Sequence, residues 1–242
     1  MQILILGDGP MGCAIATALT DRGEPSTPTG RPVGGRHDGA TFRGIDVVVD
    51  ASRGEAVAGN LEAALAAGVR RFVVATTGWS AQREAVADAL HVHRASAVVA
   101  PNFSLGVALF ARLVDVATDL FGAIDTFDPY LVEWHRRAKS DRPSGTALVL
   151  ADRIASRHPR LATAGDLETA SIRAGACPGM HLVGFDAAGE SIELRITARD
   201  RTAYAAGVLT AIDWVHRTGR PSGIHGFDAV IDDLLEAPPM AA

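Results

Sequence analysis

The densest group of chemically capable side chains lies at residues 133–146, which read EWHRRAKSDRPSGT. His135 and Lys139 are four residues apart in this segment. Three further cations stand close to them: Arg136, Arg137 and Arg142. Five potential cations within eight residues repel one another, which is costly unless an anion offsets their charge. The pattern therefore predicts a cationic proton-donor pair, His135 and Lys139, that works next to an anion.

The same segment ends in Pro143, Ser144, Gly145 and Thr146, a pattern that indicates the start of a helix. The backbone N–H groups of a helix start, together with two hydroxyls, form a site that can hold a carboxylate. We therefore expect Ser144, Gly145 and Thr146 to bind an acidic group of a substrate. A solvated basic loop followed by a helix with an ordinary serine cap gives the same pattern, and the residues alone leave both interpretations open.

A second group lies near the N-terminus, where a short apolar run leads into a Gly-x-Gly-x-x-Gly pattern. The first glycine of such a pattern turns the chain tightly, the second lets the backbone approach a pyrophosphate, and the third lets helix and strand pack closely. The helix that follows presents N–H groups to the phosphates. The pattern predicts a dinucleotide site, and a tight turn without a ligand is the alternative. The residues concerned are Gly7, Gly9, Pro10, Met11 and Gly12.

The choice between the two nicotinamide cofactors depends on the residues near position 30. Dinucleotide sites that bind NADH usually carry an acidic residue there, which bonds to the ribose. The sequence offers Thr29, Gly30 and Arg31 instead. Because an arginine suits a 2′-phosphate, Arg31 favours NADPH, with NADH as a possible second cofactor.

These groups need a scaffold, and the first hundred residues predict one. Apolar runs that read as strands alternate with alanine-rich stretches that read as helices, which is typical of a doubly wound parallel sheet of the Rossmann type. A further strand at residues 26–29 is only weakly indicated, because Gly, Pro and Thr dominate that region. The expected strands are 2–6, 46–50, 71–76 and 97–100, and the expected helices are 10–19, 55–67 and 81–90.

The pattern changes after Asn102, where a long amphipathic helix, a strand, a second helix and three more strands are expected, followed by a last helix. A strand-rich block with helices on its flanks indicates an α+β domain. We therefore predict an α/β protein of two domains. Residues 1–103 and 217–242 form the dinucleotide-binding domain, and residues 104–216 form a domain for substrate binding and oligomerisation.

Composition and charge exclude several classes of protein. A net charge of −5 with 48% hydrophobic residues argues against a protein whose main role is to bind nucleic acid or an anionic membrane. The two distant cysteines, Cys13 and Cys177, indicate reduced thiols. No apolar run approaches the length of a membrane span, and the N-terminus lacks the features of a signal peptide. We expect a cytoplasmic protein with a small-molecule substrate and, since no histidine pair has a compelling ligand spacing, no metal site.

The run E-x-H-x-x-x-K-x-D-x-P-S-G-T resembles the central motif of the dihydrodipicolinate reductase family. Four further segments resemble family motifs in the family's order, so the resemblance covers nearly the whole chain. These segments are VVDASRGEA from Val48, ATTGW at 75–79, APNFSLG at 100–106, and RAG at 173–175 with Gly179 and His181. Asp200, Arg201 and Thr202 resemble a later arginine motif.

The resemblance implies hydride transfer from NAD(P)H to a cyclic, unsaturated dicarboxylate in lysine and diaminopimelate biosynthesis, carried out by a homotetramer. It implies that His135 is the general acid, that Lys139 helps to protonate and bind the substrate, and that residues 144–146 hold a carboxylate. Hydride addition to a conjugated C=C–C=N system builds negative charge, which a nearby acid must neutralise. The residues implied around the cofactor are Ala51, Ser52, Ala75, Thr76, Thr77, Gly78, Pro101, Asn102 and Phe103.

The chain departs from the family pattern at positions that concern the substrate. Arg136 stands where the family commonly has a second histidine; it is permanently charged and could bind a carboxylate. Ile196 stands where the family has a histidine in its last core strand, Ala75 replaces a glycine, and the glycine loop is one residue shorter. Three hypotheses follow: a true 4-hydroxy-tetrahydrodipicolinate reductase, a diverged reductase for another imino or enamine acid, and a non-catalytic sensor of NADP(H).

Overall fold

The computed structural model describes residues 1–30 and 37–236, which form two compact units. The first unit comprises Met1–Leu105 and Arg201–Ala242, and the second comprises Gly106–Asp200. The sequence places residues 104–216 in one domain, but helix α6 (Thr202–His216) belongs to the first unit. The reason is that α6 packs on helix α1 (Pro10–Asp21) and on strand β4 (Arg71–Val74).

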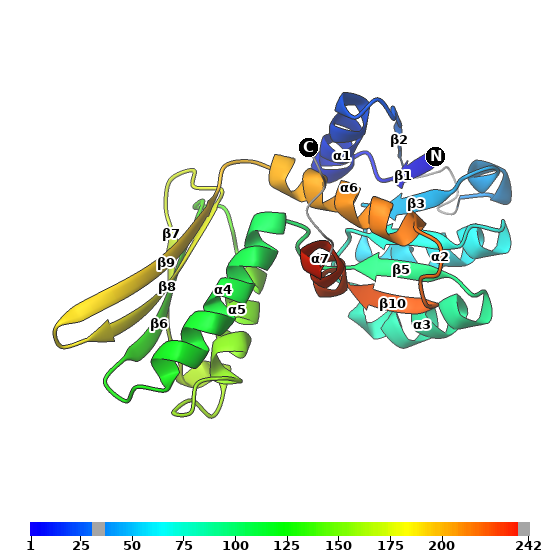
Figure 1. Ribbon diagram of the computed structural model, residues 1–242. Helices are drawn as coiled ribbons and strands as arrows, with labels where there is room; N and C mark the ends of the chain where they lie inside the picture. Colours follow the sequence, from blue (N-terminus) through cyan, green and yellow to red (C-terminus); the bar gives the residue numbers. More distant parts are fainter. Residues whose placement is uncertain (31–36, 237–242) are drawn as a thin grey trace, which may run out of the picture. The chain divides into compact units, whose positions relative to one another are not determined.

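The first unit contains a six-stranded parallel sheet in the order β10-β5-β4-β3-β1-β2. Figure 1 shows α1 and α6 on one face of this sheet and α2 and α3 on the other. This arrangement confirms the predicted Rossmann-type fold. Besides β4, the strands are β1 (Ile3–Leu6), β2 (Pro28–Thr29), β3 (Val47–Asp50), β5 (Ser96–Val99) and β10 (Gly223–Gly226). The other helices are α2 (Gly54–Ala66), α3 (Arg83–Val92) and α7 (Phe227–Glu236), with 3-10 turns η1 (Gly39–Phe42) and η2 (Ser80–Gln82).

Burial explains why these strands could be recognised in the sequence. All four residues of β3 are buried, as expected for a strand covered by helices on both faces. The second strand is the exception, because β2 comprises only two residues, both partly exposed. Arg31, which follows it closely in the sequence, lies outside the described residues.

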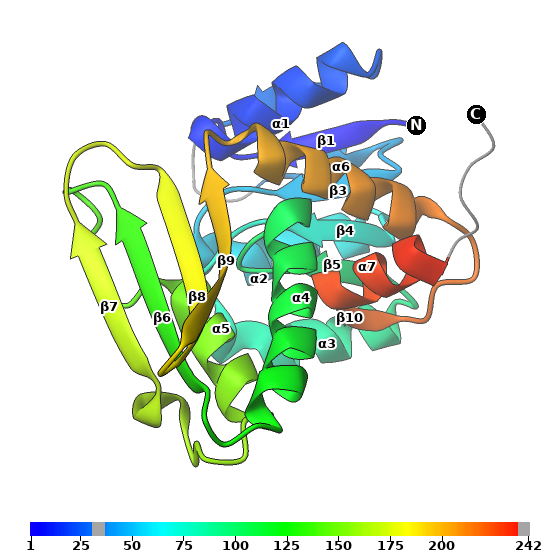
Figure 2. The ribbon, with the colours of Figure 1, turned by 60° about the vertical axis from the view of Figure 1, so that its left-hand side comes forward.

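The second unit contains a four-stranded mixed sheet in the order β7-β6-β8-β9. Strands β6 and β7 are parallel, whereas β8 is antiparallel to both β6 and β9. Two helices, α4 and α5, cover one face of the sheet (Figure 2) and share an apolar core with it. The elements are α4 (Leu105–Gly122), β6 (Asp128–His135), α5 (Gly145–Ala155), η3 (Ala164–Asp166), β7 (Glu168–Arg173), β8 (Gly179–Ala187) and β9 (Glu190–Ala198).

Alternation along β6 separates two sets of side chains, because successive residues of a strand point to opposite faces. Leu131, Glu133 and His135 are buried. Trp134, between the last two, is 37% exposed, and Ile172 opposite it on β7 is 43% exposed. One face of the sheet therefore belongs to the core under the helices, while the other presents exposed apolar side chains.

The longest helix, α4, has 18 residues and is amphipathic. Phe110 and Val114 are buried in the core of the second unit, while Leu113 and Leu120 are exposed. Among the residues that the structure describes, no helix combines the length and the apolarity needed to cross a membrane.

Candidate active site

The three glycines of the N-terminal loop each meet a different steric demand. Gly7 has a φ of 106° and lies so close to the backbone of Ala51 that a side chain would clash with it. A side chain on Gly12 would clash with the carbonyl of Gly7, so this glycine allows helix α1 to pack against the strand end. Nothing lies within 4 Å of the position that a Cβ would take on Gly9, so the backbone there is open to a ligand. These features fit a site for a pyrophosphate at the N-terminus of α1.

The other segments that the sequence assigns to the cofactor follow directly after β3, β4 and β5. Because the strands are parallel, these segments share the carboxyl edge of the sheet with the glycine loop, which is where such sheets bind ligands. Gly54 brings the segments after β3 and β4 together, since a side chain on it would clash with the carbonyl of Gly78. The assigned residues here are Ala51, Ser52, Ala75, Thr76, Thr77, Gly78, Pro101, Asn102 and Phe103.

A buried carboxylate, Asp50, organises two of these segments. Its Oδ1 accepts hydrogen bonds from the Ser52 hydroxyl at 2.6 Å and the Thr76 hydroxyl at 3.0 Å, and its Oδ2 accepts one from Asn60 at 2.8 Å. Neither Asp50 nor Asn60 was predicted from the sequence as part of the site. An acidic residue at the end of an otherwise apolar strand is the signal that could have indicated Asp50.

The third segment, residues 101–103 after β5, is held in place by contacts within the first unit. The Asn102 side chain accepts a hydrogen bond from the backbone N–H of Ser104 at 2.8 Å. Phe103 is buried, with its ring centroid 5.0 Å from that of Phe227. Gly207 on α6 lies so close to the Phe103 carbonyl that a side chain there would clash with it. The course of the chain at Asn102 and Phe103 is therefore set by packing against α6 and α7.

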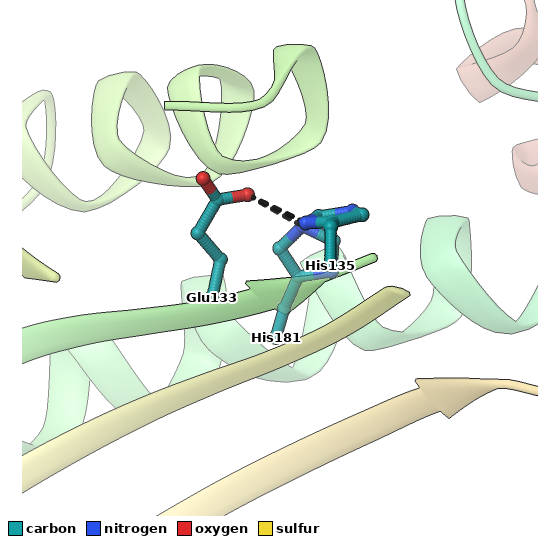
Figure 3. A group of neighbouring side chains, drawn as sticks. All are labelled: Glu133, His135 and His181. Carbon is teal, nitrogen blue, oxygen red and sulfur yellow. Dashed lines mark ion pairs between the residues drawn. The ribbon is translucent and has the colours of Figure 1, made fainter. Parts of the chain in front are cut away.

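In the second unit, strand register brings five polar side chains to one place. Glu133 on β6 lies opposite Ser171 on β7 and opposite His181 on β8. His135, two residues further along β6, lies opposite Arg173. Residues directly opposite each other in neighbouring strands project to the same face. Figure 3 shows the Glu133 carboxylate directed at the imidazole rings of His135 and His181.

Glu133 is fully buried, yet it remains a carboxylate because three donors converge on its Oε1. Arg173 donates at 2.6 Å, the Ser171 hydroxyl at 2.6 Å and the backbone N–H of Ser144 at 3.0 Å. Burial by itself raises the pKa of Glu133, but the bonds from Ser144, Ser171 and Arg173 outweigh it and lower the pKa to about 2. The site therefore contains a permanent buried negative charge.

The second carboxylate oxygen, Oε2, faces the two histidines. His135 Nδ1 lies 3.1 Å away, an ion-pair distance without the alignment of a full hydrogen bond, and His181 Nε2 lies 3.9 Å away. Burial lowers the pKa of His135, while Glu133 opposes that shift. Burial and the neighbouring His135 lower the pKa of His181 to about 4. Near neutral pH, His181 is therefore uncharged, and a proton that reaches the pair is carried by His135.

Ser144 connects this cluster to the start of α5. Its hydroxyl accepts a hydrogen bond from the backbone N–H of Ala147 at 3.2 Å, which caps the helix, and lies 3.1 Å from His181 Nε2. Both polar groups of Ser144 thus have partners within the protein. Gly145 is exposed and Thr146 partly exposed at the first turn. Among the three residues predicted to bind a carboxylate, Gly145 and Thr146 are the ones that present the helix start to solvent.

Two of the segment's cations, His135 and Lys139, face carboxylates that belong to the chain itself. Lys139 Nζ lies 2.8 Å from Asp141 Oδ1, and His135 faces Glu133, whereas Arg136 is exposed. The clustered cations predict a neighbouring anion, and Glu133 and Asp141 are the anions that the structure places there. The structure therefore places His135 and Lys139 in one segment, each next to an acidic residue.

Glu133, His135 and His181 belong to residue types that bind zinc, and their ligand atoms lie within 4.8 Å of one another. Arg173, however, is itself bonded to Glu133, and a guanidinium at 2.6 Å opposes a second cation. Hydrogen bonds satisfy Oε1 of Glu133, and His135 faces Oε2 at an ion-pair distance. The expectation of a metal-free site stays a prediction.

Two family models match the chain. "Dihydrodipicolinate reductase, N-terminus" matches residues 26–103, and "Dihydrodipicolinate reductase, C-terminus" matches residues 106–231. Together they span most of the sequence. The second match includes β6, the segment after it, β7 and β8, and therefore the whole cluster around Glu133.

Known proteins of similar sequence and structure carry related names. The 4-hydroxy-tetrahydrodipicolinate reductase of Archaeoglobus fulgidus is 35% identical over 206 residues, which cover 79% of this chain and 76% of that protein. The enzyme of that name from Thiobacillus denitrificans is 34% identical over 247 residues, covering 91% and 89%. A dipicolinate-bound dihydrodipicolinate reductase from Paenisporosarcina sp. TG-14 has a TM-score of 0.75 at 20% identity, covering 93% and 97%. The last likeness shows the fold alone.

The depressed pKa of His181 predicts a dependence of stability on pH. A histidine whose pKa falls from 6.5 unfolded to about 4 folded stabilises the protein fully above pH 6.5, and this contribution is lost as the pH falls towards 4. His181→Gln keeps a polar atom near Ser144 but does not titrate. Between pH 7.5 and 4.5, the wild type should lose roughly 2 kcal/mol more unfolding free energy than the variant. Urea denaturation at several pH values measures this, and parallel curves for the two proteins would contradict it.

Proposed function

This chain belongs to the dihydrodipicolinate reductase family, and we propose that it is a 4-hydroxy-tetrahydrodipicolinate reductase, an NAD(P)H-dependent oxidoreductase of lysine and diaminopimelate biosynthesis. The observation that carries this proposal is the cluster around Glu133, which holds an acid–base histidine at the end of β6 beside a helix start and a lysine. The relatives of that name, at about 35% identity over most of the chain, support the same reaction.

We assign the proton transfer to His135. Its Nδ1 faces Glu133, so Nε2 is the nitrogen that can present a proton to a substrate. Gly179 makes room on that side, since a Cβ there would lie 3.0 Å from Nε2. Glu133 stabilises the imidazolium, which is the form that donates the proton. Lys139 is assigned to binding and polarising the substrate, with Asp141 as its partner until an acidic substrate arrives.

We assign the substrate's carboxylates to the basic segment and the helix start. The first turn of α5, at Gly145 and Thr146, offers backbone N–H groups to an anion, while Ser144 holds this turn against Glu133. Arg136 is exposed and can form a two-pronged contact with a carboxylate.

The cofactor is assigned to the glycine loop and the adjacent strand ends of the first unit. When bound there, NAD(P)H supplies the hydride. Gly9 leaves space for the pyrophosphate, and the segments at 51–52, 75–78 and 101–103 are proposed to surround the rest of the molecule. We propose NADPH as a cofactor because Arg31 suits a 2′-phosphate, with NADH as a second possibility.

One observation supports a diverged substrate instead. On β9, Ile196 lies opposite His181, so an aliphatic side chain borders the polar cluster where the family resemblance implies a histidine. Relative to the family pattern, Ile196 and Arg136 change the charge around the substrate. A reductase for another imino or enamine acid is therefore the second candidate.

We further propose that the open face of the mixed sheet is the subunit interface of a homotetramer. This face presents Val132 and Trp134 of β6, Leu182 of β8 and Ile172 of β7. An exposed apolar set on a sheet face is typical of an interaction surface. We also propose a cytoplasmic location, which the free thiols Cys13 and Cys177 support.

The function is tested by the oxidation of NADPH in the presence of 4-hydroxy-tetrahydrodipicolinate, the product of the preceding synthase. The purified protein should turn it over, and His135→Gln should lower kcat at least about 100-fold because a positioned general acid is lost. His93→Gln, a change of the same type at a histidine in the first unit, should retain full activity. No turnover by folded wild type, or equal activity in both variants, would contradict the proposal, and turnover of another imino acid alone would favour the second candidate.

The subunit interface is tested by the mass of the particle in solution. The wild type should have about four times the chain mass of 25.2 kDa in light scattering after size exclusion. Ile172→Glu buries a charge in the proposed interface and should reduce that mass. Val92→Glu changes a residue of the first unit that is 79% exposed and should leave it unchanged. A monomeric wild type, or a tetrameric Ile172→Glu variant, would rule out this interface.

A further inference from the structure

The end of strand β2 lies directly beside the glycine loop. Thr29 pairs with Leu6, and the backbone N–H of Gly7 donates a hydrogen bond to the Thr29 carbonyl at 2.8 Å. Dinucleotide-binding sheets usually carry, at the end of this second strand, an acidic side chain that bonds to the adenosine ribose. In this chain the residue after Thr29 is Gly30, which has no side chain.

The space beside Gly30 is nevertheless occupied by a carboxylate. A Cβ built on Gly30 would lie 2.8 Å from Oδ2, 3.4 Å from Cγ and 3.9 Å from Oδ1 of Asp8. Asp8 is the residue between the first two glycines of the loop, and it is exposed. Its acidic group therefore stands where a side chain at the end of β2 would begin. A side chain at position 30 would therefore require the Asp8 carboxylate, the end of an exposed side chain, to move aside.

We propose that Asp8 is the specificity residue for the cofactor's ribose, supplying from the glycine loop the carboxylate that β2 lacks. This inference rests on the proposed function, because it requires a nicotinamide dinucleotide in this site. A carboxylate accepts hydrogen bonds from the 2′- and 3′-hydroxyls of NADH. It repels the 2′-phosphate of NADPH, which carries a charge between about −1.5 and −2 near neutral pH. Asp8 thus favours NADH.

The sequence also carries a cation next to Gly30. Arg31 follows Gly30 directly in the chain and suits the 2′-phosphate of NADPH. Asp8 opposes that preference from the loop. Asp8 and Arg31 thus have opposite preferences by charge, and removal of the Asp8 charge should shift the selectivity towards NADPH.

The experiment compares NADH and NADPH in the full-length protein carrying Asp8→Asn. Asparagine keeps the shape of the side chain but removes the charge. The ratio of kcat/KM for NADPH to kcat/KM for NADH should rise at least about tenfold, since bonds to a charged acceptor are stronger than bonds to a neutral one. Asp21→Asn is the matched control, because it removes the same charge from an exposed position at the end of α1. The control should leave the ratio unchanged.

Direct binding of each cofactor, followed by nicotinamide fluorescence without substrate, separates this inference from the proposed function. Tighter NADPH binding and weaker NADH binding in Asp8→Asn support the role of Asp8. A ratio of dissociation constants that matches the Asp21→Asn control overturns it while leaving the reductase function intact. A folded wild type that binds neither cofactor would overturn the inference and the proposed function together.

Discussion

The second unit depends on one buried charge, the carboxylate of Glu133. Taking a carboxylate out of water costs several kcal/mol, and partners recover this cost only when the geometry is good. Here a guanidinium, a hydroxyl and a backbone N–H meet on one oxygen, and two imidazoles face the other. Loss of any one partner would remove part of the compensation for this buried charge. The positions of β7, β8 and the start of α5 are therefore all tied to this side chain.

The same arrangement gives the site its chemistry. Because Arg173 occupies one carboxylate oxygen, the other remains for His135, which burial alone would hold in its neutral form. Glu133 stabilises the imidazolium form of His135. The low pKa of His181 prevents a second positive charge next to that imidazolium. In the first unit Asp50 has a parallel role, since it fixes the loops after β3 and β4 through Ser52 and Thr76.

The sequence predicts what depends on local pattern. The glycine loop, the buried strands and the capped helix at Ser144 follow from spacing and residue type, and the structure has them close to the predicted bounds. Glu133, Arg173 and His181 were not predicted as site residues, because their association depends on the register of β6 with β7 and β8. The prediction that the residues of α6 belong to the second domain was wrong for a similar reason. Helix α6 packs on α1, which is distant from it in the sequence. The role proposed for Asp8 could not be inferred from the sequence, because it depends on β2 lying beside the glycine loop.

The central claim is that Glu133 keeps His135 available as a proton donor, and the pH profile of kcat/KM for the Glu133→Gln variant tests it most directly. Activity that requires the imidazolium falls as the pH rises through the pKa of His135. Without the carboxylate that pKa should fall further, so this limb of the profile should move to lower pH, by about one unit, and kcat at neutral pH should fall about tenfold. A folded variant whose limb lies at the wild-type pH, or at a higher pH, would contradict the account.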